Sequence, residues 1–461
     1  MTISPLPRAD GHPSRPLAIV GATVIDATGA PPLHDATIVI EQGRIVSVSP
    51  KRDWPDAAEL LDAKGKFAVP GLMDANVHLV LDIPPLTMVR YEDRYDELAI
   101  EAAQLALANG VTSVFDTWGP REFLIRAREA VLQGRQAGAR IFLAGNIVGL
   151  GGPYSRDFFP LPQASLFEGF TGKINAIYEE NVGARLLWMT PRQVEAEIRD
   201  YLRKGIDFLK YAATGHASGD MEFIAFSPRI QRMIVEQTHT AGKIAQSHTT
   251  NVEGLRIAVE AGVDLLQHAD LTGPQPIPDE TIELIVKRGT ACSFLPNTRS
   301  NIDWYREKAR ATPDFMRYVV ADENERALVS AGALVCLSTD GGVFCSNTCN
   351  SGLWQSHTPP EPNLLKLGKG HFYWLEAMEE KGMPALTALQ AATRNIAQAY
   401  GVLDEIGTLE AGKIADIVLL DADPLQSAAN YKRISHVIQS GNVIDRGALP
   451  STRLLSEPGA E

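Results

Sequence analysis

The chain has 461 residues, of which 45% are hydrophobic and 21% charged, so it can bury a large core and form more than one domain. Acidic residues outnumber basic ones by 56 to 43, and the net charge of −13 disfavours binding to nucleic acid or to anionic membranes. No apolar run resembles a signal peptide or reaches membrane-spanning length. We therefore expect a cytoplasmic protein with neither nucleic acid nor membrane as a partner.

Two segments near opposite ends of the chain predict β-hairpins. Residues 37–48 are rich in β-branched residues and turn near Gly43, and residues 436–444 form a counterpart. A single hairpin buries too little surface to be stable alone. We therefore expect one small β-sandwich, built from residues 1–68 and 405–461, on either side of a domain formed by residues 69–404.

The first strand of that central domain carries the most informative motif. A proline-glycine turn leads into an apolar strand that ends in Asp74-Ala75-Asn76-Val77-His78. Successive side chains of a strand point to opposite faces, so Asn76 and His78 share a face and one ion could contact both.

Four later β-like runs also contain or end in a side chain that can bind metal. These side chains are Lys210 in residues 207–211, His248 at the end of 244–248, His268 at the end of 263–268, and Asp340 at the end of 334–340. Imidazole and carboxylate groups are ordinary zinc ligands. Burial disfavours the ammonium form of lysine, and the resulting amine can react with carbon dioxide to give an anionic carbamate.

Helix-like stretches separate these runs, and each is followed closely by a glycine that can end it. The predicted helices cover residues 88–108, 191–204, 228–241, 252–261 and 279–288. Strands that alternate with helices, and that end in metal ligands, are what a (β/α)₈ barrel with a metal centre at its C-terminal mouth requires. The predicted fold class is therefore α/β, a TIM barrel with a small β-sandwich domain.

With these motifs the chain resembles the amidohydrolase superfamily. The resemblance covers nearly the whole length of the chain. Residues 407–420 resemble the segment by which amidohydrolases return to their β-sandwich. The N-x-H motif is similar to that of the group containing the phenylurea hydrolases and molinate hydrolase. The resemblance implies a metal site with six ligands, namely Asn76, His78, Lys210, His248, His268 and Asp340. It also implies a carbamylated Lys210 and catalytic roles for Asp340, as the proton shuttle, and for His268.

The implied cofactor is a divalent metal, with zinc expected first and cobalt or manganese as alternatives. An amide oxygen is a weaker zinc donor than imidazole nitrogen. We therefore predict that Asn76 weakens or removes one of two metal positions and leaves a mononuclear or mixed centre.

Two long stretches, residues 151–189 and 341–370, exceed what a bare barrel needs and contain several aromatic residues. Loops at the C-terminal ends of barrel strands overhang the active site, so aromatic side chains there would form an apolar pocket. The predicted substrate-binding residues are Phe158, Phe159, Trp188, His216 and Phe344. They favour a small, neutral, aromatic or alkyl substrate, although they could instead only pin the loops to the barrel.

A metal-bound water has its pKa lowered from about 15.7 towards 7, which supplies hydroxide at neutral pH. Asp340 could take the water proton and pass it to the leaving nitrogen. These roles predict hydrolysis of a C–N bond in an aryl urea, amide or (thio)carbamate. The resemblance implies hydrolysis of phenylurea herbicides as the expected activity. We also expect the protein to form a homo-oligomer.

Two alternatives stay open at this point. A prolidase-like hydrolase of N-acyl amino acids or dipeptides would need a cationic anchor, for which Arg156 and Arg299 lie in or near suitable loops. An inactive binding protein is the second, because Asn76 departs from the usual ligand set.

Overall fold

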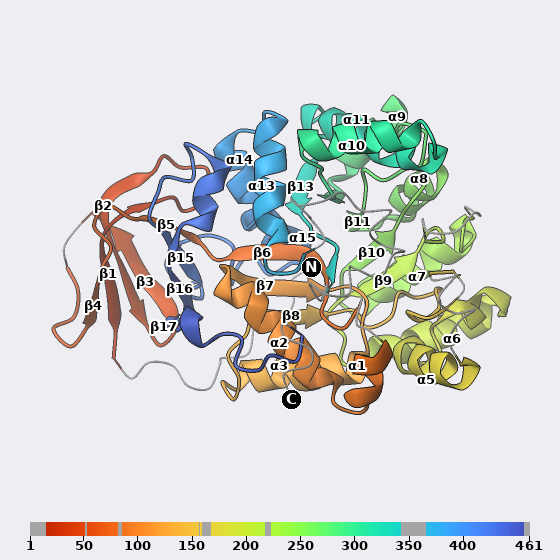
Figure 1. The fold of residues 1–461 in the computed structure, drawn as a ribbon, viewed down its shortest axis with the longest axis horizontal. Coiled ribbons are helices and arrows are strands. Elements are labelled where there is room, and N and C mark those ends of the chain that lie inside the picture. The colour runs from red at the N-terminus through yellow and green to blue at the C-terminus, as the bar shows by residue number, and fades with distance from the viewer. Residues whose placement is uncertain are drawn as a thin grey trace.

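The computed structural model describes residues 15–50, 53–81, 85–155, 157–158, 167–216, 223–342 and 366–455. Within those ranges, eight parallel strands form a barrel (Figure 1). In chain order they are β6 (Leu72–His78), β7 (Val111–Asp116), β8 (Arg140–Leu143), β9 (Leu209–Ala212), β10 (Ala245–His248), β11 (Leu265–Gln267), β12 (Ala291–Phe294) and β13 (Leu334–Leu337). The predicted TIM-barrel fold is confirmed.

Two junctions close the barrel between its halves. A parallel bridge between Val148 and Tyr211 joins the β8 side to β9. On the other side, the short strand β14 (Gly341–Gly342) follows β13 and pairs in parallel with the end of β6, where Gly342 lies opposite His78. The residues after β13 are thereby brought against the end of the first barrel strand.

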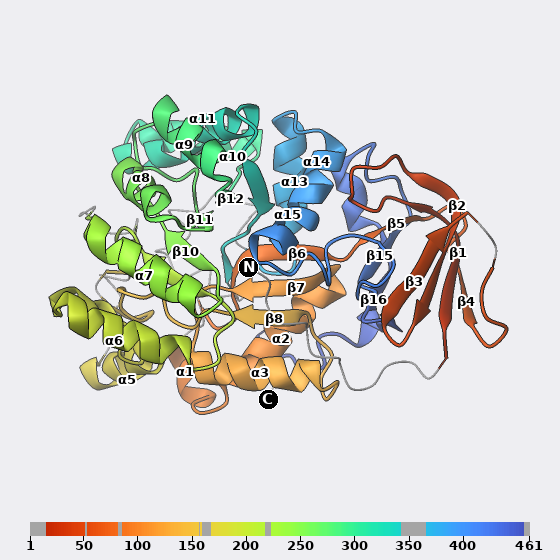
Figure 2. The same cartoon turned by 180° about the vertical axis from the view of Figure 1, so that it is seen from behind.

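Helices surround the strands, as expected for apolar faces that pack on a barrel (Figures 1 and 2). They are α1 (Pro85–Arg90), α2 (Tyr95–Ala108), α3 (Arg121–Leu132), α5 (Glu168–Glu179), α6 (Pro191–Leu202), α7 (Pro228–Thr240), α8 (Val252–Ala261), α9 (Asp279–Arg288), α10 (Arg299–Ala309), α11 (Met316–Ser330), α13 (Gly370–Glu380), α14 (Ala385–Ala391) and α15 (Arg394–Ala399). None of the helices in the described ranges is long and apolar enough to cross a membrane.

The helix predictions are correct where both ends carry a local signal. The bounds of α8 and α9 match the predicted ranges, and Gly262 and Gly289 adopt the left-handed conformation that ends each helix. The single helix predicted over residues 88–108 is wrong. The chain leaves the helix between α1 and α2, where Asp93 has φ +64°. An aspartate tolerates this conformation because its short polar side chain can bond locally.

Strands from both ends of the chain form a separate sheet in the order β17-β16-β15-β5-β1-β2-β3, with β4 paired to β1. These strands are β1 (Leu17–Val24), β2 (Leu33–Glu41), β3 (Arg44–Ser49), β4 (Glu59–Asp62), β5 (Phe67–Pro70), β15 (Ile417–Leu420), β16 (Ile434–Gln439) and β17 (Asn442–Val443). Ile19, Ile38 and Ile417 belong to a core of its own. Because β5 runs through Gly71 into β6, this sheet lies at the N-terminal end of β6, away from the barrel mouth (Figure 1).

Gly71 is required at that junction by close packing. A Cβ on this residue would lie 2.1 Å from Thr112 Oγ1, which no real contact permits. The β domain and the barrel are therefore joined at a position where only glycine fits without rearrangement.

A buried ion pair outside the mouth joins α11 to the end of α13. Lys381 Nζ contacts Asp322 and lies 3.1 Å from Glu325 Oε2, and the side chains of Lys381 and Glu325 are 6% and 1% exposed. Burial alone lowers the pKa of Lys381, but the carboxylates of Glu325 and Asp322 raise it more, so the amine stays charged.

We expect Lys381→Met to lower the free energy of unfolding by about 3–5 kcal/mol, because it leaves the buried Glu325 carboxyl group without its cation. Chemical denaturation measures this change. Lys432→Met is the matched control, since Lys432 pairs with Glu376 at 2.5 Å but its side chain is 42% exposed. Its expected loss is at most about 1 kcal/mol. Equal losses in the two variants would contradict a special role for the buried pair.

Candidate metal centre

The six side chains predicted as metal ligands all lie at or just beyond barrel strands. Asn76 and His78 lie on β6, Lys210 on β9 and His248 at the end of β10, while His268 and Asp340 follow β11 and β13. In a parallel barrel the C-terminal ends of the strands meet at one mouth. Asn76, His78, Lys210, His248 and His268 are at most 6% exposed. The Asp340 side chain is 27% exposed and is thus the ligand-type group most open to solvent.

The Asp340 carboxylate links three of the other predicted ligands. Its Oδ1 accepts a hydrogen bond from Asn76 Nδ2 at 2.8 Å and lies 2.9 Å from His78 Nε2 and 3.8 Å from His268 Nε2. Burial alone raises the pKa of Asp340, but the charges and hydrogen bonds of His268, His78 and Lys210 lower it well below its usual value. The carboxylate is therefore ionised at neutral pH.

Two of the site residues are held in a costly backbone conformation. His268 has φ +56° and Asp340 has φ +51°, which few residues other than glycine adopt. Such strain persists where surrounding contacts fix it. Asp74 provides such contacts, because its carboxylate accepts hydrogen bonds from Thr339 N at 3.1 Å and from Thr339 Oγ1 at 2.6 Å. The Asp74 of the motif thus fixes the residue next to Asp340.

Several buried imidazole nitrogens at the mouth have no hydrogen-bond partner among the described residues. Among the predicted ligands they are His78 Nδ1, both ring nitrogens of His248, and His268 Nδ1. The rings of His248 and His268 meet edge to face with centroids 5.2 Å apart. Burial lowers the pKa of His248 well below its usual value and that of His268 to about 4, so both rings are neutral at neutral pH. Neutral imidazole is the form that binds metal.

Lys210 is almost fully buried, with 1% of the residue exposed. Its Nζ donates to Thr117 Oγ1 at 3.0 Å, and the Thr117 hydroxyl in turn donates to Asn76 Oδ1. Burial lowers the pKa of Lys210 to about 8. A part of the population therefore holds a neutral amine at neutral pH, as carbamate formation requires.

In the part of the chain that the structure describes, no three His, Cys, Asp or Glu side chains form a metal site by themselves. The donor set nevertheless fits a divalent ion once Lys210 and Asn76 are included. Unpaired buried nitrogen atoms cost about 1–3 kcal/mol each, and a bound cation would remove that cost for those that face it. The chemistry of these residues thus fits a divalent metal.

Three rings form a continuous wall beside these side chains, which we call the aromatic wall: Trp118, Phe158 and His216. Trp118 contacts Phe158 at 4.7 Å and His216 at 5.1 Å between ring centroids, and His216 lies 5.0 Å from His248. Trp118 Nε1 donates to Asn146 Oδ1 at 2.9 Å, which fixes the indole. The structure therefore places the predicted His216 next to His248, and the predicted Phe158 against Trp118 and His216.

Trp118 was not among the residues predicted from sequence. It lies two residues beyond the end of β7, at the C-terminal mouth of the barrel. Its place just after a predicted strand was the only local signal.

The prediction that Trp188 lines the substrate pocket is wrong. The stretch from residue 151 to 189 contains α5 and the 3₁₀ helix η1 (Ala184–Trp188), and Trp188 is 90% exposed. Leu186 of η1 is 1% exposed, so this turn packs inward through leucine and leaves the tryptophan outside. The other two predicted substrate contacts in these loops, Phe159 and Phe344, lie outside the described residues.

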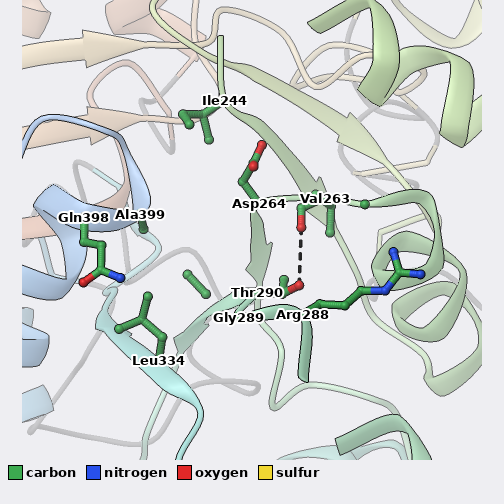
Figure 3. Close-up of a pocket in the computed structure, with 11 residues that line it drawn as sticks. Ile244, Val263, Asp264, Arg288, Gly289, Thr290, Leu334, Gln398 and Ala399 are labelled. Carbon is green, nitrogen blue, oxygen red and sulfur yellow. Dashed lines mark hydrogen bonds between the residues drawn. The ribbon is translucent and has the colours of Figure 1, made fainter. Parts of the chain in front are cut away.

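A cavity of about 460 Å³ lies at the other end of the barrel strands (Figure 3). Its lining includes Ile244, Val263 and Leu334, which lie before or at the starts of β10, β11 and β13. Thr290 and Val263 both line it, and Thr290 Oγ1 donates a hydrogen bond to Val263 O at 3.4 Å. Because ligand-type residues gather at the opposite ends of these strands, this cavity is separate from the candidate metal centre.

A closed parallel barrel with imidazole, carboxylate and lysine groups at its mouth, joined to a β domain, defines a class of metal-dependent hydrolases. The chain matches the amidohydrolase family over residues 67–444 and belongs to that family. It is a hydrolase acting on carbon–nitrogen bonds.

Two solved structures are similar to it over most of both chains. Molinate hydrolase has a TM-score of 0.89 and 35% identity, with 96% of this chain and 97% of that chain covered. Phenylurea hydrolase B has a TM-score of 0.88 and 36% identity, with 96% and 99% covered. The predicted resemblance to this group is confirmed.

Curated relatives are more distant. Ochratoxinase from Aspergillus niger is 24% identical over 455 residues, which cover 93% of this chain and 86% of that protein. Imidazolonepropionase from Agrobacterium fabrum is 27% identical over 414 residues, which cover 87% of each. Relatives at this distance act on different substrates, so family membership alone does not define the substrate of this chain.

Proposed function

We propose that this chain hydrolyses the carbonyl C–N bond of a small neutral urea, amide or (thio)carbamate that carries an aryl or alkyl group, with phenylureas as the first candidates. The observation that carries the proposal is the aromatic wall, which runs from Phe158 and Trp118 through His216 to His248. An apolar wall that meets polar catalytic groups suits a substrate with one flat apolar end and one carbonyl. The similarity to molinate hydrolase and phenylurea hydrolase B supports the same choice.

The residues proposed to hold a divalent metal are the six ligand-type side chains, with zinc expected first and cobalt or manganese as alternatives. When bound, such an ion polarises a carbonyl and lowers the pKa of its water towards about 7. Lys210 would contribute as a carbamate. These assignments rest on the neutral imidazoles and the buried amine described above.

Asp340 is proposed to accept a proton and to deliver it to the leaving nitrogen. Its carboxylate is ionised, and Asn76 and His78 orient its Oδ1. The side chain is 27% exposed, so it can also exchange a proton with the mouth. A positioned acid and base of this kind contributes typically about 10²–10⁴-fold to a rate.

A prolidase-like activity on N-acyl amino acids is the second candidate from sequence. Its substrate carboxylate needs a cation at the mouth. Arg299 is exposed at the start of α10, where its backbone N–H donates to Glu380 Oε2 at 2.6 Å. Arg156 lies outside the described residues. The choice of a neutral substrate therefore rests on the aromatic wall and not on the position of either arginine.

The test is kcat/KM of the metal-loaded protein on a matched panel of phenylureas, thiocarbamates, anilides and N-acyl amino acids. We expect the neutral aryl compounds to be preferred. Pairs that differ only by a carboxylate, such as an anilide and its carboxylated analogue, isolate the effect of charge. A preference of tenfold or more for the carboxylated member would contradict the proposal and favour the prolidase-like activity.

Removal of metal is expected to abolish hydrolysis, and addition of zinc, cobalt or manganese is expected to restore it. Treatment with a chelator followed by dialysis and activity measurement tests this, with a non-chelating isomer of the same compound as the control. Elemental analysis then counts the ions in each chain. We expect one tightly bound ion, because the Asn76 oxygen is a weak donor and already accepts a hydrogen bond from Thr117. Two tightly bound ions would contradict the mononuclear prediction.

A further inference from the structure

Four side chains form one hydrogen-bonded chain across the barrel mouth. Lys210 Nζ donates to Thr117 Oγ1 at 3.0 Å, Thr117 Oγ1 donates to Asn76 Oδ1, and Asn76 Nδ2 donates to Asp340 Oδ1 at 2.8 Å. These residues come from β9, the end of β7, β6 and the end of β13. Thr117 and Asn76 are both fully buried. The chain thus joins the amine proposed to be carbamylated to the carboxylate proposed to carry protons.

Asn76 suits this place because an amide carries an acceptor and a donor on one carbon. Its oxygen accepts from Thr117 while its nitrogen donates to Asp340. One short side chain thereby connects the two sides of the mouth.

Within the described ranges, the hydrogen bonds of the Thr117 hydroxyl run to other barrel strands and not to its own loop. Thr117 N donates to Val77 O at 3.1 Å, which continues the strand pairing. The Asp116 carboxylate fixes the adjacent backbone by accepting from Leu79 N at 2.7 Å and from Trp118 N at 3.2 Å. The hydrogen bonds of Thr117 Oγ1 described above go to two predicted ligands, Lys210 and Asn76. This hydroxyl is therefore positioned to orient the side chains of Lys210 and Asn76.

We propose that Thr117 is a positioning residue, whose hydroxyl sets the orientation of the Lys210 side chain and, through Asn76, that of Asp340. This inference rests on the proposed function. When the neutral Lys210 amine adds to carbon dioxide, an N–C bond forms, one C–O π pair moves to oxygen, and one proton leaves to solvent. The carbamate nitrogen keeps one hydrogen, which can still donate to Thr117 Oγ1. That contact would restrict rotation of the carbamate and leave both of its oxygens for metal.

The test compares Thr117→Val, which removes the hydroxyl at nearly constant shape, with Thr117→Ser, which keeps it. We expect Thr117→Val to lower both kcat and metal affinity by about 10–100-fold, as for loss of a group that orients a metal ligand, with KM changed less than about threefold. Thr117→Ser is expected to stay within about threefold of wild type. Metal affinity is measured by competition with a chromogenic chelator. Incorporation of isotope-labelled bicarbonate, followed by NMR, reports the carbamate.

Thr238→Val is the matched control. Thr238 is also fully buried, and its Oγ1 donates to Ile234 O at 2.8 Å within α7, away from the mouth. It should leave kcat and metal affinity within about threefold of wild type. Should Thr117→Val fail to fold, Thr117→Ala removes the same hydroxyl without a second methyl group and carries the same expectation.

Wild-type metal affinity and kcat in Thr117→Val would overturn the inference. Equal losses in the valine and serine variants would also overturn it, because side-chain shape rather than the hydroxyl would then be responsible. Failure of the proposed function looks different. Wild type would then hydrolyse no compound of the panel, while the metal affinity and carbamate signal of the Thr117 variants would still test the positioning role.

Discussion

Replacement of Lys210 by alanine is expected to reduce kcat/KM by more than about 100-fold and to release bound metal. The reason is that Lys210 is proposed to supply an anionic metal ligand. Loss of a group that only orients a metal ligand already lowers metal affinity or activity by about 10–100-fold. The side chain is almost fully buried beside Thr117, so no solvent-exposed residue can readily replace it. Elemental analysis and steady-state kinetics of the same preparation measure the two effects.

Chemical rescue separates the loss of a carbamate from a general loss of structure. Lys210→Ala leaves space where a short carboxylic acid such as acetate or propionate can bind and supply the missing oxygen ligands. Lys210→Met is the matched control, because its side chain fills that space and should block rescue. Wild-type activity in Lys210→Ala would refute the ligand role. Rescue of both variants to the same level would show that the added acid acts elsewhere.

Replacement of Asp340 by asparagine is expected to lower kcat by about 10²–10⁴-fold with a much smaller change in KM, because it removes the proposed proton carrier. The amide retains an oxygen that can accept the hydrogen bonds now made by Asn76 and His78. The fold should therefore remain, with the melting temperature within a few degrees of wild type, and kinetics should show the loss mainly in kcat.

Asp264→Asn is the control for that substitution. Like Asp340, Asp264 contacts a histidine ring: its Oδ2 lies 2.8 Å from His239 Nε2. The same oxygen accepts a hydrogen bond from Ala245 N at 2.8 Å. Asp264 lies, however, at the opposite end of the barrel strands. It should keep kcat within about threefold of wild type. A comparable loss of kcat in both variants would mean that Asp340 acts through stability and not through the reaction.

The sequence could predict the barrel and the identity of the ligand-type residues because both are encoded locally. Each strand has an apolar run, and His248, His268 and Asp340 stand at or within three residues of the end of a strand. The helices α8 and α9 were predicted at their correct bounds because glycine ends them. The break between α1 and α2 was missed, because Glu92 and Asp93 do not interrupt a helical pattern as clearly as glycine or proline does.

Only the tertiary structure decided how these residues meet. Asp340 is bonded to Asn76 and His78, which precede it by 264 and 262 positions, and neither contact has a local signature. The contacts of Trp118 and Thr117 depend likewise on the closing of the barrel, and the packing of η1 leaves Trp188 exposed. Local patterns determine which strands form and what ends them, since side-chain alternation is a property of a few neighbouring residues. Contacts between distant strands depend on strand register and barrel closure, which a linear pattern does not contain.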